Sequence, residues 1–253
     1  MKYVASCSFG KDSLATIILA IQYRLPLHEV VYCEVMFDDD ISGEVPEHRA
    51  FIQDRALPFL EEHGIKVTVL RSEMTFIKSF YRVLTKGKNI GKINAWPLCG
   101  KCCIQRDCKL APINAYRAGL GDDVIQYIGI AYDEPERLAR LDRKRQVSLL
   151  EAYRMTEQDA AQLCMDWGLY SPVYQITKRN GCFFCPNSKM QELRHLYAYH
   201  PELWARLLEC QKAPNKVTEK FNRTHRIDEI DGIFKFEDSQ LSLFDGTAGA
   251  YAA

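Results

Sequence analysis

The sequence predicts an α/β fold in which helices flank a parallel twisted sheet, with a smaller helical, cysteine-bearing part toward the C-terminus. Short apolar runs that suit buried strands alternate with segments that suit helices, a pattern typical of parallel strands joined by crossover helices. Apolar residues make up 47% of the 253 residues, which is sufficient for a full hydrophobic core. After Ser148 the pattern changes to short helices and a Cys-x-x-Cys sequence.

The expected elements follow in a regular order. Apolar runs predict strands at residues 3–5, 30–37, 65–70 and 124–130. Helices are expected at residues 14–20, 46–63, 76–84, 112–118, 156–167, 190–199 and 201–209. Pro46 suits a first helical turn, and Gly64 suits a helix end. Thr156 and Asp159 have the spacing of a capping box.

These changes of pattern predict three parts. Residues 1–147 form a nucleotide-binding α/β domain, residues 148–212 a helical cysteine-bearing subdomain packed on it, and residues 213–253 a partly flexible C-terminal extension. The long polar segment at residues 85–101 is expected to be a functional or mobile loop.

Charge and hydropathy exclude two classes of protein. The formal net charge is zero, which argues against strong non-specific binding of nucleic acid. A run of basic residues at 137–145 is either a solvent-exposed helix face or a local contact for phosphate groups. No apolar run approaches a membrane span, and the chain begins directly with a strand rather than a leader, so a cytoplasmic protein is expected.

The most informative segment is Ser8-Phe9-Gly10-Lys11-Asp12-Ser13, which joins the first expected strand to the first expected helix. A strand, a tight loop and a helix N-terminus direct unpaired N–H groups and the positive end of the helix dipole at one place, where a phosphate binds. The segment is neither a Walker A loop nor a Gly-x-Gly-x-x-Gly fingerprint. An ordinary turn capped by Asp12 or Ser13 is the alternative.

Polar residues also follow two other expected strands. Asp38 begins a run of three aspartates, which either bind Mg²⁺ through water or form a polar loop. Asp133, Glu134 and Arg137 follow the strand at 124–130, where parallel sheets bind ligands. The Arg137 guanidinium suits phosphate or sulfate.

Ten cysteines in a chain expected to be cytoplasmic indicate metal binding or catalysis rather than disulfides. One group contains Cys99, Cys102, Cys103 and Cys108, and the other is Cys182-Phe-Phe-Cys185. Two such groups can complete a four-thiolate site, which suits Zn²⁺ and an iron–sulfur cluster equally. Cys7, Cys33, Cys164 and Cys210 lie in apolar segments and are expected to be buried packing residues.

The segment at residues 8–13 resembles the PP-loop of the adenine-nucleotide α-hydrolase superfamily, usually Ser-Gly-Gly-Lys-Asp-Ser. Two further segments resemble the PAPS reductase family, and in particular its prophage-type members: Gly129–Arg137, and Cys102-Cys103-Ile-Gln-Arg106 followed 78 residues later by Cys182-x-x-Cys185. The resemblance covers roughly residues 1–210. It implies a [4Fe-4S] cluster held by thiolates of Cys102, Cys103, Cys182 and Cys185. Cys108 is an extra candidate ligand at a place where the reductases have no thiol, and Cys108 or Cys99 could replace one of the adjacent pair, so the ligand set of the first group stays open.

The resemblance also implies an activity. Lys11-Asp12-Ser13 is typical of PP-loop ATP pyrophosphatases, so ATP and Mg²⁺ are expected ligands, and Lys11, Asp12 and Arg137 expected catalytic residues. Ser8, Phe9, Gly10 and Ser13, with Asp38, Asp133 and Glu134, are expected to complete the nucleotide site. The enzyme would cleave ATP at the α-phosphate and transfer sulfur to a nucleic acid or a small molecule, with a donor protein supplying sulfur or electrons.

Two alternatives remain open. A sulfonucleotide reductase would bind PAPS or APS, but the tail after Cys210 lacks the Glu-Cys-Gly-x-His sequence that carries that family's nucleophile. A non-catalytic nucleotide-binding subunit with a structural metal centre is compatible with Ala131, which stands where the family usually has arginine.

Overall fold

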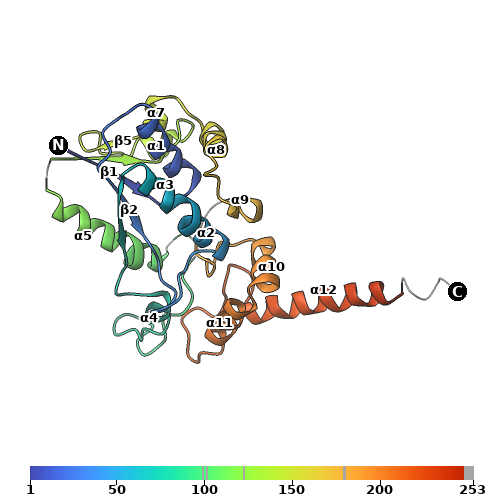
Figure 1. The fold of residues 1–253 in the computed structure, drawn as a ribbon. Helices are drawn as coiled ribbons and strands as arrows, with labels where there is room; N and C mark the ends of the chain where they lie inside the picture. The colour runs from blue at the N-terminus through green and yellow to red at the C-terminus, as the bar shows by residue number, and fades with distance from the viewer. Residues whose placement is uncertain (99, 101, 122, 179–180, 248–253) are drawn as a thin grey trace. The chain divides into compact units, whose positions relative to one another are not determined.

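The computed structural model describes residues 1–98, 100, 102–121, 123–178 and 181–247, which form two compact units (Figure 1). The first unit comprises Met1–Phe76 and Ile104–Cys182, and the second comprises Ile77–Cys103 and Phe183–Ala253. The chain therefore passes between the two units three times.

The first unit is built on a five-stranded parallel sheet. Its strands are β1 (Lys2–Cys7), β2 (Glu29–Cys33), β3 (Lys66–Leu70), β4 (Val124–Ile128) and the short β5 (Gln146–Val147). They lie in the order β3-β2-β1-β4-β5, and every pairing is parallel. The α/β class and the parallel sheet predicted from the sequence are confirmed.

Side-chain alternation gives each face of this sheet its own core. Ala5 and Cys7 of β1 belong to the larger cluster, together with Tyr32 of β2. Val4, which precedes Ala5, belongs to a smaller cluster on the opposite face with Val31 and Val124. Both faces are therefore covered, as a parallel sheet requires.

Helices cover both faces of the sheet (Figure 1). The helices of this unit are α1 (Lys11–Gln22), α2 (Pro46–Phe51), α3 (Leu57–Glu62), α5 (Ala111–Gly119), α6 (Pro135–Leu138), α7 (Leu149–Ala152), α8 (Glu157–Asp166) and α9 (Val173–Ile176). Residues of α1, α3, α7 and α8 pack in the larger cluster, whereas Tyr116 of α5 packs against the smaller one. Two π-helical segments, η1 (Ile52–Ala56) and η2 (Gln105–Leu110), join α2 to α3 and lead into α5.

The predicted helix boundaries follow local chemistry. Pro46 occupies the first turn of α2, where its missing N–H has no intrahelical partner to lose. Thr156 and Asp159 form the predicted capping box at the start of α8. Gly64 and Gly168 adopt φ values of 64° and 66° directly after the helices that they end.

The second unit is helical. It contains α10 (Met190–Tyr199), α11 (Pro201–Gln211) and α12 (Ile227–Thr247), while α4 (Phe76–Phe80) begins at the boundary with the first unit. The Trp96 side chain forms edge-to-face contacts with Phe80 and Phe221, with ring centroids 4.9 and 5.0 Å apart. Its indole N–H donates to Gln211 Oε1 over 3.1 Å. In neither unit does a described helix combine the length and apolar character needed to span a membrane.

Several boundaries differ from those expected. The strands expected at 30–37 and 124–130 end at Cys33 and Ile128. The helix expected at 76–84 ends at Phe80, because the chain turns back and the N–H groups of Asn94 and Ala95 donate to the carbonyls of Arg82 and Phe80. The compact units also divide the chain differently from the expected parts at 147 and 212. Helices α7 and α8 pack on α1 within the first unit, and Trp96 packs with the C-terminal helical segment.

Glu29 on β2 makes the first unit sensitive to acid. Its side chain is 1% exposed. Burial alone would raise its pKa, but hydrogen bonds from Lys2, Thr68, Tyr116 and Lys66 lower the pKa from 4.5 to about 2. A lowered pKa means that the unfolded chain binds the proton more tightly, so this stabilisation is complete above about pH 4.5 and declines as the pH falls toward 2.

We therefore expect Glu29→Gln to lower the melting temperature most at neutral pH. The difference between wild type and variant should shrink as the pH falls from 5 to about 2.5, because the unfolded wild-type chain binds a proton at Glu29 in this range whereas the folded chain does not. Calorimetric melting at several pH values measures this difference. A melting-temperature difference that stays constant with pH would contradict the assignment.

Candidate nucleotide site and cysteine segments

The Ser8–Ser13 segment lies at the topological switch point of the sheet. From β1 the chain first builds β2 and β3 on one side, and then returns to place β4 on the other side of β1. Open parallel sheets bind ligands at the carboxyl ends of the strands that flank such a point. The segment follows β1, and Gly129 follows β4, so both lie at this position.

The loop is held in a strained conformation. Phe9 has a φ of 56°, which is uncommon for a residue with a side chain. Its ring is fully buried and forms an edge contact with Tyr32, with centroids 5.0 Å apart. Packing of the ring therefore fixes the backbone conformation of the loop. Phe9 thus shapes the loop, and its expected contact with the nucleotide stays a prediction.

Three N–H groups at this turn are available to an anion. The N-terminal residues of a helix have no intrahelical acceptor, and no side chain caps α1. Within the described residues, the N–H groups of Gly10, Asp12 and Ser13 have no hydrogen-bond partner. The Ser13 hydroxyl, by contrast, donates to the Gly10 carbonyl over 2.9 Å and accepts from the Ser8 N–H over 3.4 Å. It braces the loop.

Gly129 lets the end of β4 approach this turn closely. A Cβ atom at position 129 would lie 2.7 Å from the backbone nitrogen of Ser13, and 2.8 Å from the carbonyl carbon and oxygen of Asp12. All three atoms belong to the backbone at the start of α1, so no side-chain rotation relieves the clash. The sequence therefore needs glycine here.

The Lys11 ammonium is neutralised by two carboxylates. It lies 2.8 Å from Asp12 Oδ1 and 2.8 Å from Glu157 Oε2. Burial alone would lower the pKa of Lys11, but the hydrogen bonds to both carboxylates raise it. Burial raises the pKa of Asp12. A phosphate group that binds here would compete with these two carboxylates for the Lys11 ammonium. Sequence analysis did not predict the contact of Glu157 with Lys11, because α8 is distant from α1 in the chain.

Tyr174 holds the remaining N–H group of the turn. Its phenol oxygen accepts from the Lys11 N–H over 2.9 Å. Burial raises the pKa of this phenol to about 12, so it stays protonated at neutral pH. The phenol oxygen thus occupies the position at which an oxygen of a bound anion would accept the same hydrogen bond.

We expect Tyr174→Phe to raise the affinity for ATP. Breaking one internal hydrogen bond costs about 0.5–1.5 kcal/mol, which corresponds to roughly a two- to tenfold change in the dissociation constant. Isothermal titration calorimetry with ATP measures it. Tyr170→Phe is the matched control, because the Tyr170 ring stacks on Tyr174 with centroids 5.0 Å apart and the substitution keeps that ring. Weaker ATP binding in Tyr174→Phe would mean that the phenol assists the ligand.

The acidic residues after β4 are engaged within the protein. Asp133 Oδ1 accepts from the Glu157 N–H over 3.0 Å and so holds the start of α8. Glu134 Oε2 accepts from the Ala131 N–H over 3.2 Å, and the Arg137 guanidinium pairs with the Glu134 carboxylate at 2.5 and 2.7 Å. These contacts position the segment. The ligand contacts expected of Asp133, Glu134 and Arg137 stay predictions.

Asp38 shapes the loop after β2. Its Oδ1 accepts from the N–H groups of Asp40 and Ile41 over 3.0 and 2.7 Å, which is the pattern of an Asx-turn. The structure therefore gives Asp38 a local backbone role, and its expected contact with the nucleotide stays a prediction.

His48 on α2 is a further residue of the site that sequence analysis did not single out. It is fully buried, with Nε2 3.2 Å from the Ser8 carbonyl oxygen and Nδ1 2.9 Å from Ser171 Oγ. Burial lowers its pKa, so the ring is neutral at physiological pH and supports the loop from behind. A histidine on the apolar face of the helix, three residues before Phe51, was the available signal.

The predicted metal-binding cysteines are divided between the units. Cys102, Cys103 and Cys185 belong to the second unit, and Cys108 and Cys182 belong to the first; Cys99 lies outside the described residues. Cys108 is fully buried, whereas the other four are half-buried. Cys7, Cys33, Cys164 and Cys210 are buried, as expected.

Local structure anchors two of these cysteines. A β-bridge pairs Cys182 with Glu44, whose carboxylate accepts from the Tyr32 hydroxyl over 3.2 Å. Phe183 and Phe184 are 3% and 2% exposed and hold the turn that leads to Cys185.

The Cys103 sulfur has two polar neighbours in the second unit. Asn94 Nδ2 lies 3.8 Å from it and also donates to the Ser79 carbonyl over 3.1 Å. The Ser79 hydroxyl lies 3.7 Å from the sulfur. Hydrogen bonds of this kind stabilise negative charge on a metal-bound thiolate. The surroundings of Cys103 thus suit a metal ligand.

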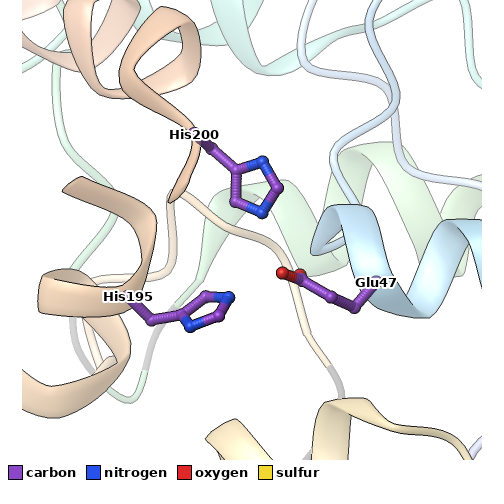
Figure 2. A group of neighbouring side chains, drawn as sticks. All are labelled: Glu47, His195 and His200. Carbon is purple, nitrogen blue, oxygen red and sulfur yellow. The ribbon is translucent and has the colours of Figure 1, made fainter. Parts of the chain in front are cut away.

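The two histidines of the helical unit lie close together in sequence and in space. His195 projects from α10 and His200 follows that helix, with ring centroids 5.8 Å apart; Figure 2 also draws Glu47 of α2 in the first unit. His195 packs against the Tyr199 ring at 4.7 Å. Both histidines therefore take part in ring packing within the helical unit.

Comparison with known proteins gives matches only among solved structures. No family model and no curated protein matches the sequence. Nine chains of known structure match. One is the U34-tRNA thiolase NcsA from Methanococcus maripaludis with its [4Fe-4S] cluster, which is 17% identical, with a match that covers 91% of this chain and 80% of that chain at a TM-score of 0.41.

Proposed function

We propose that this chain is a PP-loop enzyme that binds ATP at residues 8–13 and cleaves it at the α-phosphate. The observation that supports this proposal best is the turn between β1 and α1. Three N–H groups without acceptors, the Lys11 ammonium and the close approach of Gly129 meet there at the switch point of a parallel sheet. Such a turn binds phosphate groups.

The chain's own groups suit release of pyrophosphate. An oxygen of the acceptor attacks the α-phosphorus, the bond from that phosphorus to the bridging oxygen breaks, and pyrophosphate leaves with the electron pair. The N–H groups of Gly10, Asp12 and Ser13, together with Lys11, stabilise the negative charge that develops on the leaving group. Mg²⁺ adds charge neutralisation on the phosphates, and Arg137 contacts the phosphate chain after it leaves Glu134.

The cysteine spacing favours an iron–sulfur centre in the same protein. We assign the half-buried Cys102, Cys103, Cys182 and Cys185 as its ligands. The buried Cys108 is the substitute expected from the sequence, and zinc is the alternative metal. Held by these residues, an iron–sulfur cluster would supply sulfur for transfer to the adenylated acceptor, a nucleic acid or a small molecule. A separate donor protein would then replace the sulfur or supply electrons.

The ATP step is tested by pyrophosphate release. Purified protein is incubated with ATP and Mg²⁺, and pyrophosphate and AMP are quantified with and without single-stranded nucleic acid. Equal release of pyrophosphate and AMP supports the proposal. Release of sulfite from PAPS or APS in the presence of thioredoxin would favour a sulfonucleotide reductase, and ATP binding without turnover would favour a nucleotide-binding subunit.

The metal centre is tested by anaerobic purification with iron, sulfide and zinc analysis. We expect iron and sulfide in about equal amounts and absorbance near 400 nm. Cys103→Ser and Cys185→Ser should lose both, whereas Cys210→Ala, which changes a buried cysteine of the same unit, should keep them. If the protein is colourless and contains stoichiometric zinc, the cysteines form a structural zinc site and the cluster assignment is wrong. Cys108→Ser then shows whether the buried thiol is a ligand.

A further inference from the structure

A cavity in the second unit lies apart in sequence from the ATP loop. Its volume is about 470 Å³, within the range of small-molecule sites. One wall is formed by Pro97, Leu98 and Gly100, and Gly100 stands two residues before Cys102 in the sequence. The other wall is the segment at residues 218–223. The described lining residues are Pro97, Leu98, Gly100, Thr218, Lys220, Phe221, Asn222 and Arg223.

Hydrogen bonds and ring packing fix both walls. A parallel β-bridge joins Ile93 to Lys216, so the segments that precede the two walls run side by side. The edge contact between Trp96 and Phe221 joins the walls themselves. The buried Lys216 ammonium donates to the carbonyls of Gln211 and Ala213 and ties the second segment to the end of α11.

The cavity combines an apolar surface with uncompensated positive charge. Pro97 and Leu98 line it, and Leu98 is 57% exposed. Lys220 and Arg223 are exposed, and neither has a hydrogen bond or ion pair with another described residue. The acidic groups nearest in sequence are engaged elsewhere: Glu219 pairs with Lys216 and Asp228 with Arg226.

We propose that this cavity binds one nucleotide of a single-stranded nucleic acid. The base would lie against Pro97 and Leu98, while Lys220 and Arg223 contact the adjoining phosphates. An apolar wall beside two cations without ion-pair partners suits a nucleotide of a single strand, because a base has apolar faces and each adjoining phosphate carries a negative charge. This inference names the place where the nucleic-acid acceptor of the proposed reaction binds. The role of the bound strand as acceptor rests on the proposed function.

Binding is tested on the full chain without ATP. A fluorescein-labelled single-stranded RNA of ten nucleotides, and DNA of the same sequence, are titrated by fluorescence anisotropy at several salt concentrations. The variant Lys220→Ala/Arg223→Ala should bind about tenfold more weakly at low salt, and its salt dependence should fall by about 0.7 in log–log slope for each cation removed. Leu98→Asp should weaken binding to a similar extent.

The control removes equal charge from the same unit. Lys86→Ala/Lys212→Ala changes two exposed lysines outside the cavity and should leave the affinity within twofold. Equal weakening by both double variants would show that only general charge matters and would overturn the proposal. So would unchanged binding in Lys220→Ala/Arg223→Ala, no binding of either oligonucleotide, or preference for duplex or for an acidic peptide.

The two proposals fail in different experiments. In the absence of acceptor, water can supply the oxygen that attacks the α-phosphorus, giving AMP and pyrophosphate. This slow hydrolysis uses only the proposed ATP site of the first unit, and we expect it to be unchanged in Lys220→Ala/Arg223→Ala. Loss of oligonucleotide binding with normal ATP turnover supports the inference. Oligonucleotide binding that depends on these cations, in a protein without ATP turnover, would support the cavity and overturn the proposed reaction.

Discussion

Replacing Lys11 by alanine is expected to lower pyrophosphate release from ATP by about 10²- to 10³-fold. Loss of one preorganised group that stabilises developing charge has effects of this size. Lys11 is the only side-chain cation within the Ser8–Ser13 loop, and the substitution also leaves Asp12 and Glu157 without the ammonium that separates them. Initial rates of pyrophosphate release at saturating ATP and Mg²⁺ measure the effect.

Two companion variants separate chemistry from structure. Lys11→Arg keeps the charge and should retain part of the rate. Glu157→Gln weakens the same link between α1 and α8 but leaves the Lys11 ammonium in place, and it should keep the rate and tighten ATP binding. If Glu157→Gln loses as much activity as Lys11→Ala, Lys11 acts by joining the two helices. The melting temperature should change little in Lys11→Ala and in Glu157→Gln, since a partly exposed ion pair contributes about 0–1 kcal/mol to the free energy of unfolding.

Gly129→Ala is expected to abolish measurable ATP binding while the protein still folds. The added methyl group would lie 2.7 Å from the Ser13 nitrogen, so the start of α1 must move away from β4. Steric insertion into a packed position costs about 1–3 kcal/mol of stability. The same movement misdirects the N–H groups of Asp12 and Ser13. Calorimetric titration with ATP, paired with thermal melting, separates the two effects.

Gly119→Ala is the matched control. A Cβ atom there would meet no heavy atom within 4 Å, and the residue ends α5. Alanine is favoured over glycine in helices, so this variant should bind ATP normally and melt at the same or a slightly higher temperature. Wild-type ATP affinity in Gly129→Ala would show that the nucleotide does not use the N–H groups of this turn.

Local sequence patterns predicted the elements that local chemistry determines. Apolar runs located β1 to β4, and the capping box at Thr156 located the start of α8. The strand–loop–helix pattern predicted the turn that joins β1 to α1, whereas phosphate binding at this turn stays a prediction. The short strand β5 was not predicted, because two residues are too few to show the alternation of apolar and polar side chains that predicts a strand. Its pairing with β4 also depends on the rest of the sheet.

Contacts between distant segments were beyond these patterns. Tyr174 and His48 reach the Ser8–Ser13 loop from segments 163 and 40 residues away in sequence, and nothing in their immediate neighbours indicates that. Glu157 reaches Lys11 only because α8 packs on α1. The pairing of Arg137 with Glu134 was not predicted either, because both residues were expected to contact a ligand from their position after the strand at 124–130.

The discontinuous second unit has a consequence for how the chain folds during synthesis. Residues 77–103 leave the ribosome long before residues 183–247, with which they share a core. Trp96 is 1% exposed in the folded protein. During synthesis its side chain stays exposed to solvent until its neighbour Phe221 has been added, more than a hundred residues later. Closing so long a loop is slow and leaves apolar surface open to aggregation. Nascent chains halted before Phe221 should for this reason bind chaperones at the segment that contains Trp96.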